Sequence, residues 1–273
     1  MKRVLMGASA LALCTGMAQA AGLDRSGQSI GALYADDGTF SLGLGTVTPS
    51  VTGTDALGNS YDVGERYNQL SLSYTNRIND QFSYTFLMDQ PYGANTTYNN
   101  NPASSMLGGT TADLSSQSFS FIGKYQISDR ISVHGGLRAQ AVEASVSLNG
   151  IAYQQGIAAP GLAAGFNAAK NASPAAGLPD VTAAQVIAAG TAVAGGGTSA
   201  DDATYALIGA NQISNLGTAY NNFGAGGGYQ YSGTKDWSAG YLLGAAYEIP
   251  EIAFRLSATY FSKVSHTADT TET

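Results

Sequence analysis

The sequence contains a single cysteine, Cys14, and it lies in the first 20 positions. These positions are typical of an export signal: a basic start, an apolar run over 4–17, and Ala-Gln-Ala at 18–20 as a cleavage site. We therefore expect 1–20 to be a signal peptide and the mature chain to begin at Ala21. Such a chain has no thiol, which excludes disulfides, zinc–cysteine clusters and a cysteine nucleophile.

Charged residues are also scarce, at 11% of the sequence against about 25% in ordinary soluble domains. Removal of the signal leaves 10 basic and 19 acidic residues, a net charge of −9, which argues against nucleic-acid binding. No apolar run after residue 20 reaches the roughly 18 residues of a membrane-spanning helix. With 35 glycines and 16 tyrosines, this composition is typical of a membrane β-barrel or of a secreted soluble β protein.

Motifs for catalysis or metal binding are missing as well. His134 and His266 are the only histidines, and neither has a serine and an acid at triad spacing. HExxH and EF-hand motifs do not occur, and the glycines at 224–228 are not followed by a Lys-Ser/Thr pair. We predict that the protein is not an enzyme and has no catalytic residue, metal site or cofactor.

The sequence is rich in segments that alternate apolar and polar residues. In 82–89, Phe82, Tyr84, Phe86 and Met88 share one face, whereas Ser83, Thr85 and Asp89 share the other and Leu87 is an exception. This period predicts strands with two different faces, and many of them predict an all-β, transmembrane antiparallel β-barrel with lipid outside. Seven strands are expected, at 40–52, 67–77, 81–90, 115–127, 131–148, 237–249 and 253–265.

The connections between these strands alternate in length. Turns near 79, 129 and 251 are tight, whereas 53–66, 91–114 and 149–235 are long. Short turns on one rim and long loops on the other are typical of outer-membrane barrels, and a soluble sandwich has no reason to segregate them. We therefore expect 40–273 to be a partial barrel and 149–235 to be an extracellular loop.

The loop 149–235 is too long for a bare connection. We expect Asp180 to cap a helix over 181–194, and a second helix at 203–216, with Pro160, Pro174 and Pro179 as breaks. Low-complexity disorder is the alternative for this segment.

Several short motifs between residues 65 and 265 resemble those of the FadL-type outer-membrane transporters. They are Ile78-Asn79-Asp80-Gln81-Phe82, Tyr92-Gly93, Gly108-Gly109-Thr110, Asp113-Leu114, Ser128-Asp129-Arg130-Ile131-Ser132, Gly135-Gly136-Leu137, Asp236-Trp237-Ser238-Ala239-Gly240-Tyr241 and Ala246-Tyr247-Glu248-Ile249. The resemblance implies a fourteen-stranded barrel plugged by an N-terminal hatch, of which seven strands would be the first half. The hatch-like segment here, 21–39, is short and lacks the Asn-Pro-Ala motif of the family; the same letters at 101–103 lie in a later loop.

The resemblance also implies a mechanism of transport. An apolar ligand such as a long-chain fatty acid is caught in a groove between outer loops and leaves sideways through a kink in the third strand. The matching positions are Gln90, Pro91, Tyr92 and Gly93, where Pro91 has no backbone donor and Gly93 permits unusual dihedrals. We expect the loop 149–235 to supply the groove through Leu162, Phe166, Val186, Ile187, Leu207 and Ile208. Lys170 and Lys124 are candidate cations for a carboxylate.

These expectations place the protein in the outer membrane of a Gram-negative bacterium as a multi-pass barrel. We expect it to be a monomer that contacts outer-membrane lipid and lipopolysaccharide, is inserted by the barrel-assembly machinery and binds no nucleic acid. A general porin or a structural or adhesive barrel is the alternative. The inward faces carry mostly Ser, Thr, Gly and Gln rather than rows of charge, which favours a transporter over a porin.

Overall fold

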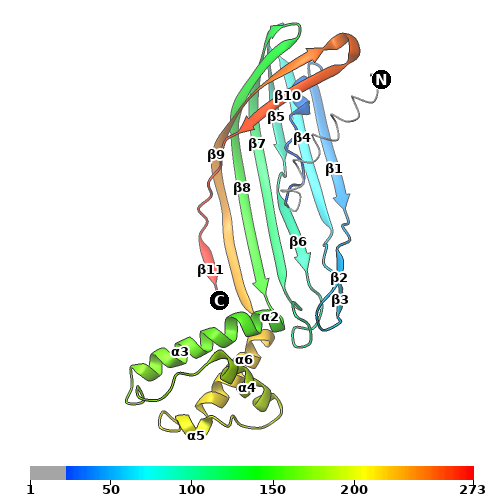
Figure 1. The fold of residues 1–273 in the computed structure, drawn as a ribbon. Helices are drawn as coiled ribbons and strands as arrows, with labels where there is room; N and C mark the ends of the chain where they lie inside the picture. Colours follow the sequence, from blue (N-terminus) through cyan, green and yellow to red (C-terminus); the bar gives the residue numbers. More distant parts are fainter. Residues whose placement is uncertain (1–22) are drawn as a thin grey trace, which may run out of the picture.

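The structure is a computed structural model that describes residues 23–273, so the expected signal peptide at 1–20 lies outside the described residues. Its main element is one curved antiparallel sheet, crossed by strands in the order β1-β4-β5-β7-β8-β9-β10 (Figure 1). The bounds are β1 Thr39–Val47, β4 Tyr67–Arg77, β5 Phe82–Asp89, β7 Thr111–Ser128, β8 Ile131–Leu148, β9 Tyr229–Ile249 and β10 Phe254–Phe261. Each strand pairs with the next long strand along the chain, which is the expected meander.

Side chains alternate between the two faces of this sheet, as the sequence predicts. The convex face is apolar and exposed: Phe121, Leu137 and Leu243 have 57%, 73% and 56% of their surface accessible. The concave face is mainly polar and is covered over the middle of the sheet, where Thr85 and Ser132 are fully buried. A continuous apolar face of this size on the outside of a sheet requires an apolar environment.

The predicted strands agree with the observed ones, with differences at the ends. The predicted ranges 67–77 and 131–148 coincide with β4 and β8, whereas β9 begins at Tyr229 rather than at 237. Four short strands within the long connections or at the end were missed. They are β2 Thr52–Thr54 and β3 Ser60–Asp62, which form a hairpin, β6 Gly93–Thr97, which pairs with β7, and β11 Thr270–Glu272, which pairs with β9.

The long connection 149–228 folds as a group of helices beyond one end of the sheet, which we call the cap (Figure 1). The short turns lie at the opposite end. The cap helices are α2 Ile151–Tyr153, the π-helical turn η2 Gln154–Ala158, α3 Ala159–Asn171, α4 Ala183–Ala194, α5 Asp202–Tyr205 and α6 Gln212–Ala225. Their small core includes Ala159, Val186, Ala189, Tyr205 and Ile213. None of the described helices is long and apolar enough to cross a membrane.

The helix predictions in this region need correction. Asp180 does not cap α4; Thr182 does, in a capping box with Gln185, and Asp180 instead forms an ion pair with Lys170 at 3.1 Å. A capping box satisfies two free backbone N–H groups at once, which explains why Thr182 prevails. Pro160 does not break a helix either, but lies directly after the π-helical turn η2 within the continuous helical run 151–171.

The second predicted helix, 203–216, is also wrong. The chain forms the short α5, turns at Asn211 in a left-handed conformation (φ 61°), and then forms α6. The carboxylate of Asp202 accepts hydrogen bonds from the backbone N–H groups of Ile213 (2.8 Å) and Ser214 (3.1 Å), so it caps α6 from another helix. Burial raises the pKa of the Asp202 carboxyl. These bonds and the one from the Ser214 hydroxyl outweigh it and hold the pKa below its usual range.

The segment before β1 lies on the concave face of the sheet, with a short helix η1 at Gly31–Tyr34. Leu33 is 1% exposed and packs with Ile122 and Leu242 of the sheet. The hydroxyl of Thr75 donates to the backbone oxygen of Ala32 at 2.7 Å. The N-terminal segment is therefore attached to the inner side of the curved sheet.

Candidate functional site

The third long strand of the sheet is interrupted between β5 and β6. β5 ends at Asp89 and β6 begins at Gly93, with Gln90, Pro91 and Tyr92 between them. Pro91 is fully buried and has no backbone N–H to offer a neighbour. β5 pairs with both β4 and β7, whereas β6 pairs with β7 along its length and on its other side has only an isolated bridge between Thr96 and Gly64, ahead of β4. The interruption therefore changes the wall mainly on the side of β4.

On the side of β7, the interruption is bridged. Ladder pairing with β7 runs to Asp89 from one side and resumes at Gly93 from the other. In between, the hydroxyl of Ser116 accepts a hydrogen bond from the N–H of Tyr92 and donates one to its carbonyl oxygen, both at 2.7 Å. One side chain thus replaces the missing pair of ladder bonds.

On the side of β4, the ladder stops. The last pair between β4 and β5 is Leu72 with Met88. Beyond it, the backbone N–H of Leu70 donates to the side-chain oxygen of Gln90 at 2.8 Å rather than to a backbone carbonyl. β1 still pairs with Tyr67–Thr75 on the opposite side of β4, so Tyr67–Leu70 have a ladder on one side only.

The N-terminal segment fills this gap as a short piece of strand. The N–H of Arg25 donates to the oxygen of Pro91 at 2.8 Å, and the N–H of Gly93 donates to the oxygen of Leu23 at 2.9 Å. Asp24 and Tyr92 are therefore opposite each other in an antiparallel bridge. On the other side, the amide nitrogen of Gln69 donates to the oxygen of Arg25 at 3.0 Å.

The side chain of Arg25 binds both edges of the gap. Its guanidinium carbon lies 3.7 Å from the ring centroid of Tyr67 on β4, and its Nη2 donates to Oδ1 of Asn95 on β6 at 2.6 Å. Gly93 makes room for it, because a Cβ at that position would overlap the guanidinium. Next to this contact is a pocket of about 350 Å³ that includes Val51 and Val63 in its lining.

Further residues of the N-terminal segment bind polar groups of the concave face. The hydroxyl of Ser26 donates to Asp89 at 2.8 Å. The side chain of Gln28 donates to the hydroxyl of Tyr92 at 2.8 Å and accepts a hydrogen bond from Arg138. Near the interruption, the concave face thus carries the charged side chains of Asp89 and Arg138 in addition to the expected Ser, Thr, Gly and Gln.

The six residues predicted to line a ligand groove all lie in the cap, but they have different surroundings. Val186 is fully buried in the cap core, and Leu162, Phe166, Ile187 and Ile208 are partly buried around it. Leu207 is 74% exposed and lies apart from that cluster. Lys170 is not available to a ligand carboxylate, because it is buried and bound to Asp180 and to the backbone oxygen of Leu178 (2.8 Å).

A larger recess, of about 620 Å³, lies between the cap and the loop that follows β6. Its lining includes Pro102, Ala103, Ala194 and Ala225, with amide side chains at its margin. The loop is fixed by Asp55, whose carboxylate accepts from the hydroxyl of Ser105 (2.8 Å) and the N–H of Met106 (2.9 Å). Partial desolvation raises the pKa of Asp55, but these bonds and those from Asn59 outweigh it and hold it well below the usual range.

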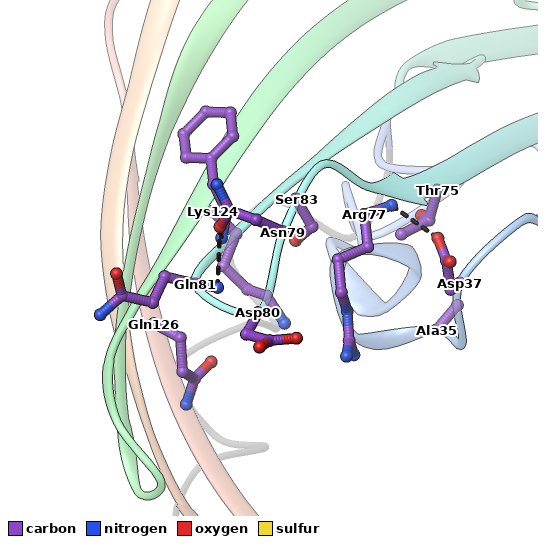
Figure 2. A pocket seen from close by; sticks show the side chains of 11 residues that line it. Ala35, Asp37, Thr75, Arg77, Asn79, Asp80, Gln81, Ser83, Lys124 and Gln126 are labelled. Carbon is purple, nitrogen blue, oxygen red and sulfur yellow. Dashed lines mark hydrogen bonds between the residues drawn. The ribbon is translucent and has the colours of Figure 1, made fainter.

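A third pocket lies at the rim with the short turns, as Figure 2 shows. Its lining is mainly polar, with Ala35 and Phe82 as apolar members, and Asp37 accepts a hydrogen bond from the backbone N–H of Arg77 at 2.6 Å. Its volume of about 40 Å³ is too small for an acyl chain or an aromatic ring. This pocket is therefore not a site for a hydrophobic ligand.

The sequence singled out the interrupted strand but missed the segment that fills it. Residues 24–28 read Asp-Arg-Ser-Gly-Gln, with no periodicity that predicts a strand. The available signal was the concentration of polar side chains directly after an expected cleavage site. Such side chains need partners when they enter a barrel, but the sequence does not identify those partners.

Comparison with known proteins identifies a family for this chain. Residues 18–273 match the family model described as "Outer membrane protein transport protein (OMPP1/FadL/TodX)". No curated protein sequence matches the chain. Among solved structures, a Pseudomonas aeruginosa FadL homologue matches at 13% identity with a TM-score of 0.38; the match covers 82% of this chain and 42% of that one.

A TM-score of this size is too low to support an inference, so the assignment rests on the family model and the observed sheet. The family model matches nearly the whole chain, and the sheet has the apolar outer face and segregated loop lengths of a transmembrane antiparallel β-barrel. The chain therefore belongs to the OMPP1/FadL/TodX family of outer-membrane transport proteins.

Proposed function

We propose that this protein takes part in the passive uptake of hydrophobic compounds, such as long-chain fatty acids, across the outer membrane of a Gram-negative bacterium. The observation that carries the proposal is the gap in the ladder between β4 and the third strand, which is bridged only by the N-terminal segment and by an isolated pair of Gly64 with Thr96. A solute that leaves through this gap enters lipid directly. Each buried methylene of such a solute contributes about 0.8 kcal/mol, so an apolar path is enough to drive the transfer.

The uptake path that we propose begins at the cap. Leu162, Phe166, Ile187, Ile208 and the exposed Leu207 offer apolar surface to a ligand, and the recess beside Pro102 lies next to them on the same rim. Val186 supports this surface from the core of the cap. The ligand then passes along the concave face to Gln90–Gly93 and leaves there through the wall. The protein would act as a monomeric barrel whose convex face is in contact with lipid.

The experiment for the exit is the double substitution Pro91→Thr with Gly93→Val, which restores a backbone donor and a β-branched residue at the interruption. Uptake of labelled fatty acid by cells that carry the full chain is expected to fall at least several-fold. The control is Pro250→Thr with Gly177→Val, which makes the same changes at the rim of short turns and in an open turn of the cap, away from the gap. Unaltered uptake in the Pro91/Gly93 variant would remove the lateral exit from the proposal.

The experiment for capture is deletion of the cap helices, residues 151–225, with a short glycine-serine connection in their place. We expect slower uptake at low ligand concentration and an unchanged rate at saturation, because capture raises the local ligand concentration and does not change the exit. Conductance of the same protein in planar bilayers separates a transporter from a porin. A large, steady ion current would contradict the uptake mechanism proposed here.

A further inference from the structure

The convex face changes from apolar to polar along β8 in the direction of the cap. Its apolar part runs from Ile131 to Ala141, which is the length that a tilted strand needs to cross the hydrocarbon of a bilayer. Beyond Ala141, the residues on the same face are Glu143, Ser145 and Ser147. The last part of β8 therefore stands outside the hydrocarbon, on the side of the cap.

A row of stacked rings marks this border. The ring of Trp237 on β9 stacks on that of Phe119 on β7 with 5.7 Å between centroids, and Phe119 stacks on Phe86 of β5 at 6.1 Å. Trp237 and Phe119 meet across β8 because the residues that pair with them there, Ala139 and Ala141, are small. Aromatic rings concentrate where hydrocarbon meets lipid headgroups.

Directly beyond the row, a bulge in β9 sets Lys235 on the convex face. The register of β9 against β8 shifts between Val142 and Ala144, so Thr234 and Lys235 lie opposite Glu143 alone. Bulges at the rims of barrels re-aim side chains in this way. Lys235 is exposed, and among the ion pairs of residues 23–273 none joins it to Glu143 or to another acid.

The amino group of Lys235 is held by uncharged partners. Its Nζ lies 5.5 Å from the ring centroid of Trp237 and donates to Oε1 of Gln117 at 3.5 Å. At the rim of short turns, by contrast, the exposed Arg130 forms an ion pair with Glu251 at 3.0 Å. The rim beside the cap therefore presents a cation whose charge is available to an anion at the level of the headgroups.

A groove lined by hydroxyl and amide groups continues from Lys235 toward the cap. Its volume is about 390 Å³, and all of its lining side chains are uncharged. The lining residues on the convex face come from β7, β8, β9 and β11: Thr111, Ser145, Ser147, Gln230, Ser232 and Thr271. Such groups both donate and accept hydrogen bonds, which suits a ligand that has many hydroxyls of its own, such as a sugar.

These features follow one another in the order in which a phosphorylated glycolipid carries its parts. The apolar part of the face fits acyl chains, Lys235 fits a phosphate, and the groove beyond it fits sugars. A glycerophospholipid supplies the first two parts, but it has no sugar chain to enter the groove.

We propose that Lys235 and this groove, together called the headgroup site, bind the phosphorylated sugar headgroup of lipopolysaccharide in the outer leaflet. Charge complementarity and continuity with the apolar face identify this occupant. The headgroup site is separate from the uptake path proposed above, because it lies on the convex face whereas that path follows the concave face.

The test measures lipid binding to the full chain folded in detergent micelles. Trp237 is the only tryptophan of the sequence, so its emission reports on the headgroup site. Purified lipopolysaccharide is the probe, and phosphatidylglycerol, which has a phosphate and no sugar, is the comparison. We expect lipopolysaccharide to shift the emission with a dissociation constant at least about tenfold lower than that of phosphatidylglycerol. Equal affinities would overturn the proposal, since the face would then be a general lipid-contacting surface.

The phosphate contact is tested by Lys235→Gln, with Arg130→Gln as the matched control that removes the exposed cation of the opposite rim. Lys235→Gln is expected to weaken lipopolysaccharide binding about tenfold, because a charge-assisted hydrogen bond is lost. Dephosphorylated lipopolysaccharide should bind the native chain and Lys235→Gln equally. The proposal is wrong if Lys235→Gln and Arg130→Gln bind intact lipopolysaccharide with the same affinity.

The sugar contact is tested by Thr111→Val with Thr271→Val, which removes two hydroxyls of the groove and keeps the branched shape of each side chain. Thr52→Val with Thr54→Val, on the exposed strand β2, is the control. We expect the groove variant to bind lipopolysaccharide several-fold more weakly and phosphatidylglycerol unchanged. Heat-modified electrophoretic mobility shows that each variant is folded. A folded groove variant that binds lipopolysaccharide as tightly as the control would contradict the placement of sugars in the groove.

Discussion

The wall and the cap are built from a similar set of small and uncharged residues, but they place apolar side chains on opposite sides. In the wall, the apolar residues are exposed on the convex face and the polar residues are buried on the concave face. In the cap, the apolar residues form the core. Leu137 of the wall and Leu207 of the cap are 73% and 74% exposed. Equal exposure of two leucines therefore has a different energetic consequence on a face that contacts lipid and on one that contacts water.

The largest expected effect comes from placing a charge at these two leucines. Leu137→Arg puts a cation in the middle of β8 on the lipid side and is expected to cost about 2–4 kcal/mol of folding free energy. Leu207→Arg is expected to change it by less than about 0.5 kcal/mol, because its surroundings are water. Urea titration of each variant folded into lipid vesicles measures the difference. Equal costs at the two positions would mean that the convex face does not contact lipid.

A smaller effect is expected from glycines in the cap. A Cβ on Gly217 would lie 2.5 Å from the backbone carbon of Ala189, so α4 and α6 approach too closely there for any side chain. Gly217→Ala is expected to destabilise the cap by about 1–3 kcal/mol. Gly165→Ala in α3 meets nothing within 4 Å and should stabilise its helix by about 0.5–1 kcal/mol.

Limited proteolysis of the cap, together with the heat-modified electrophoretic mobility of the barrel, tests the substitutions Gly217→Ala and Gly165→Ala. We expect Gly217→Ala to speed cleavage within the cap while the barrel remains folded. If the barrel unfolds together with the cap, the two regions are not as independent as their separate cores indicate.

The smallest effect is expected at Asp202, as a dependence of cap stability on pH. Its folded pKa lies below the usual value, so its contribution is fully present above the unfolded pKa and is lost as the pH falls through the folded pKa. Below about pH 4, the cap should become more sensitive to protease by an amount near 1 kcal/mol, the usual value of a helix cap. Asp202→Asn should remove this dependence, and the stability of the wall should not follow it.

The sequence was most informative about the wall. Alternation over many residues fixes which face each side chain takes, so the ranges 67–77 and 131–148 matched the strands at both ends. The interruption also lies at the residues that a proline and a glycine mark in the sequence, Pro91 and Gly93. The role of that interruption in transport remains a prediction.

The cap and the N-terminal segment were less predictable for physical reasons. Alanine and glycine give weak helical periodicity, and the cap of α6 comes from Asp202 in a different helix, a contact that no local pattern encodes. The position of Arg25 depends on Asn95, which is 70 residues away in sequence. Contacts of this range follow from the curvature of the sheet around the N-terminal segment, and a segment without periodicity does not reveal them.

The hydroxyl of Ser116 has a mechanical consequence. By binding both the N–H and the carbonyl oxygen of Tyr92, it keeps the third strand attached to its neighbour at the very residues where the ladder is missing. Any widening of the interruption must therefore separate the third strand from β4, while its attachment to β7 stays intact. A departing molecule would meet the bilayer in one fixed direction, and the barrel would not have to come apart to release it.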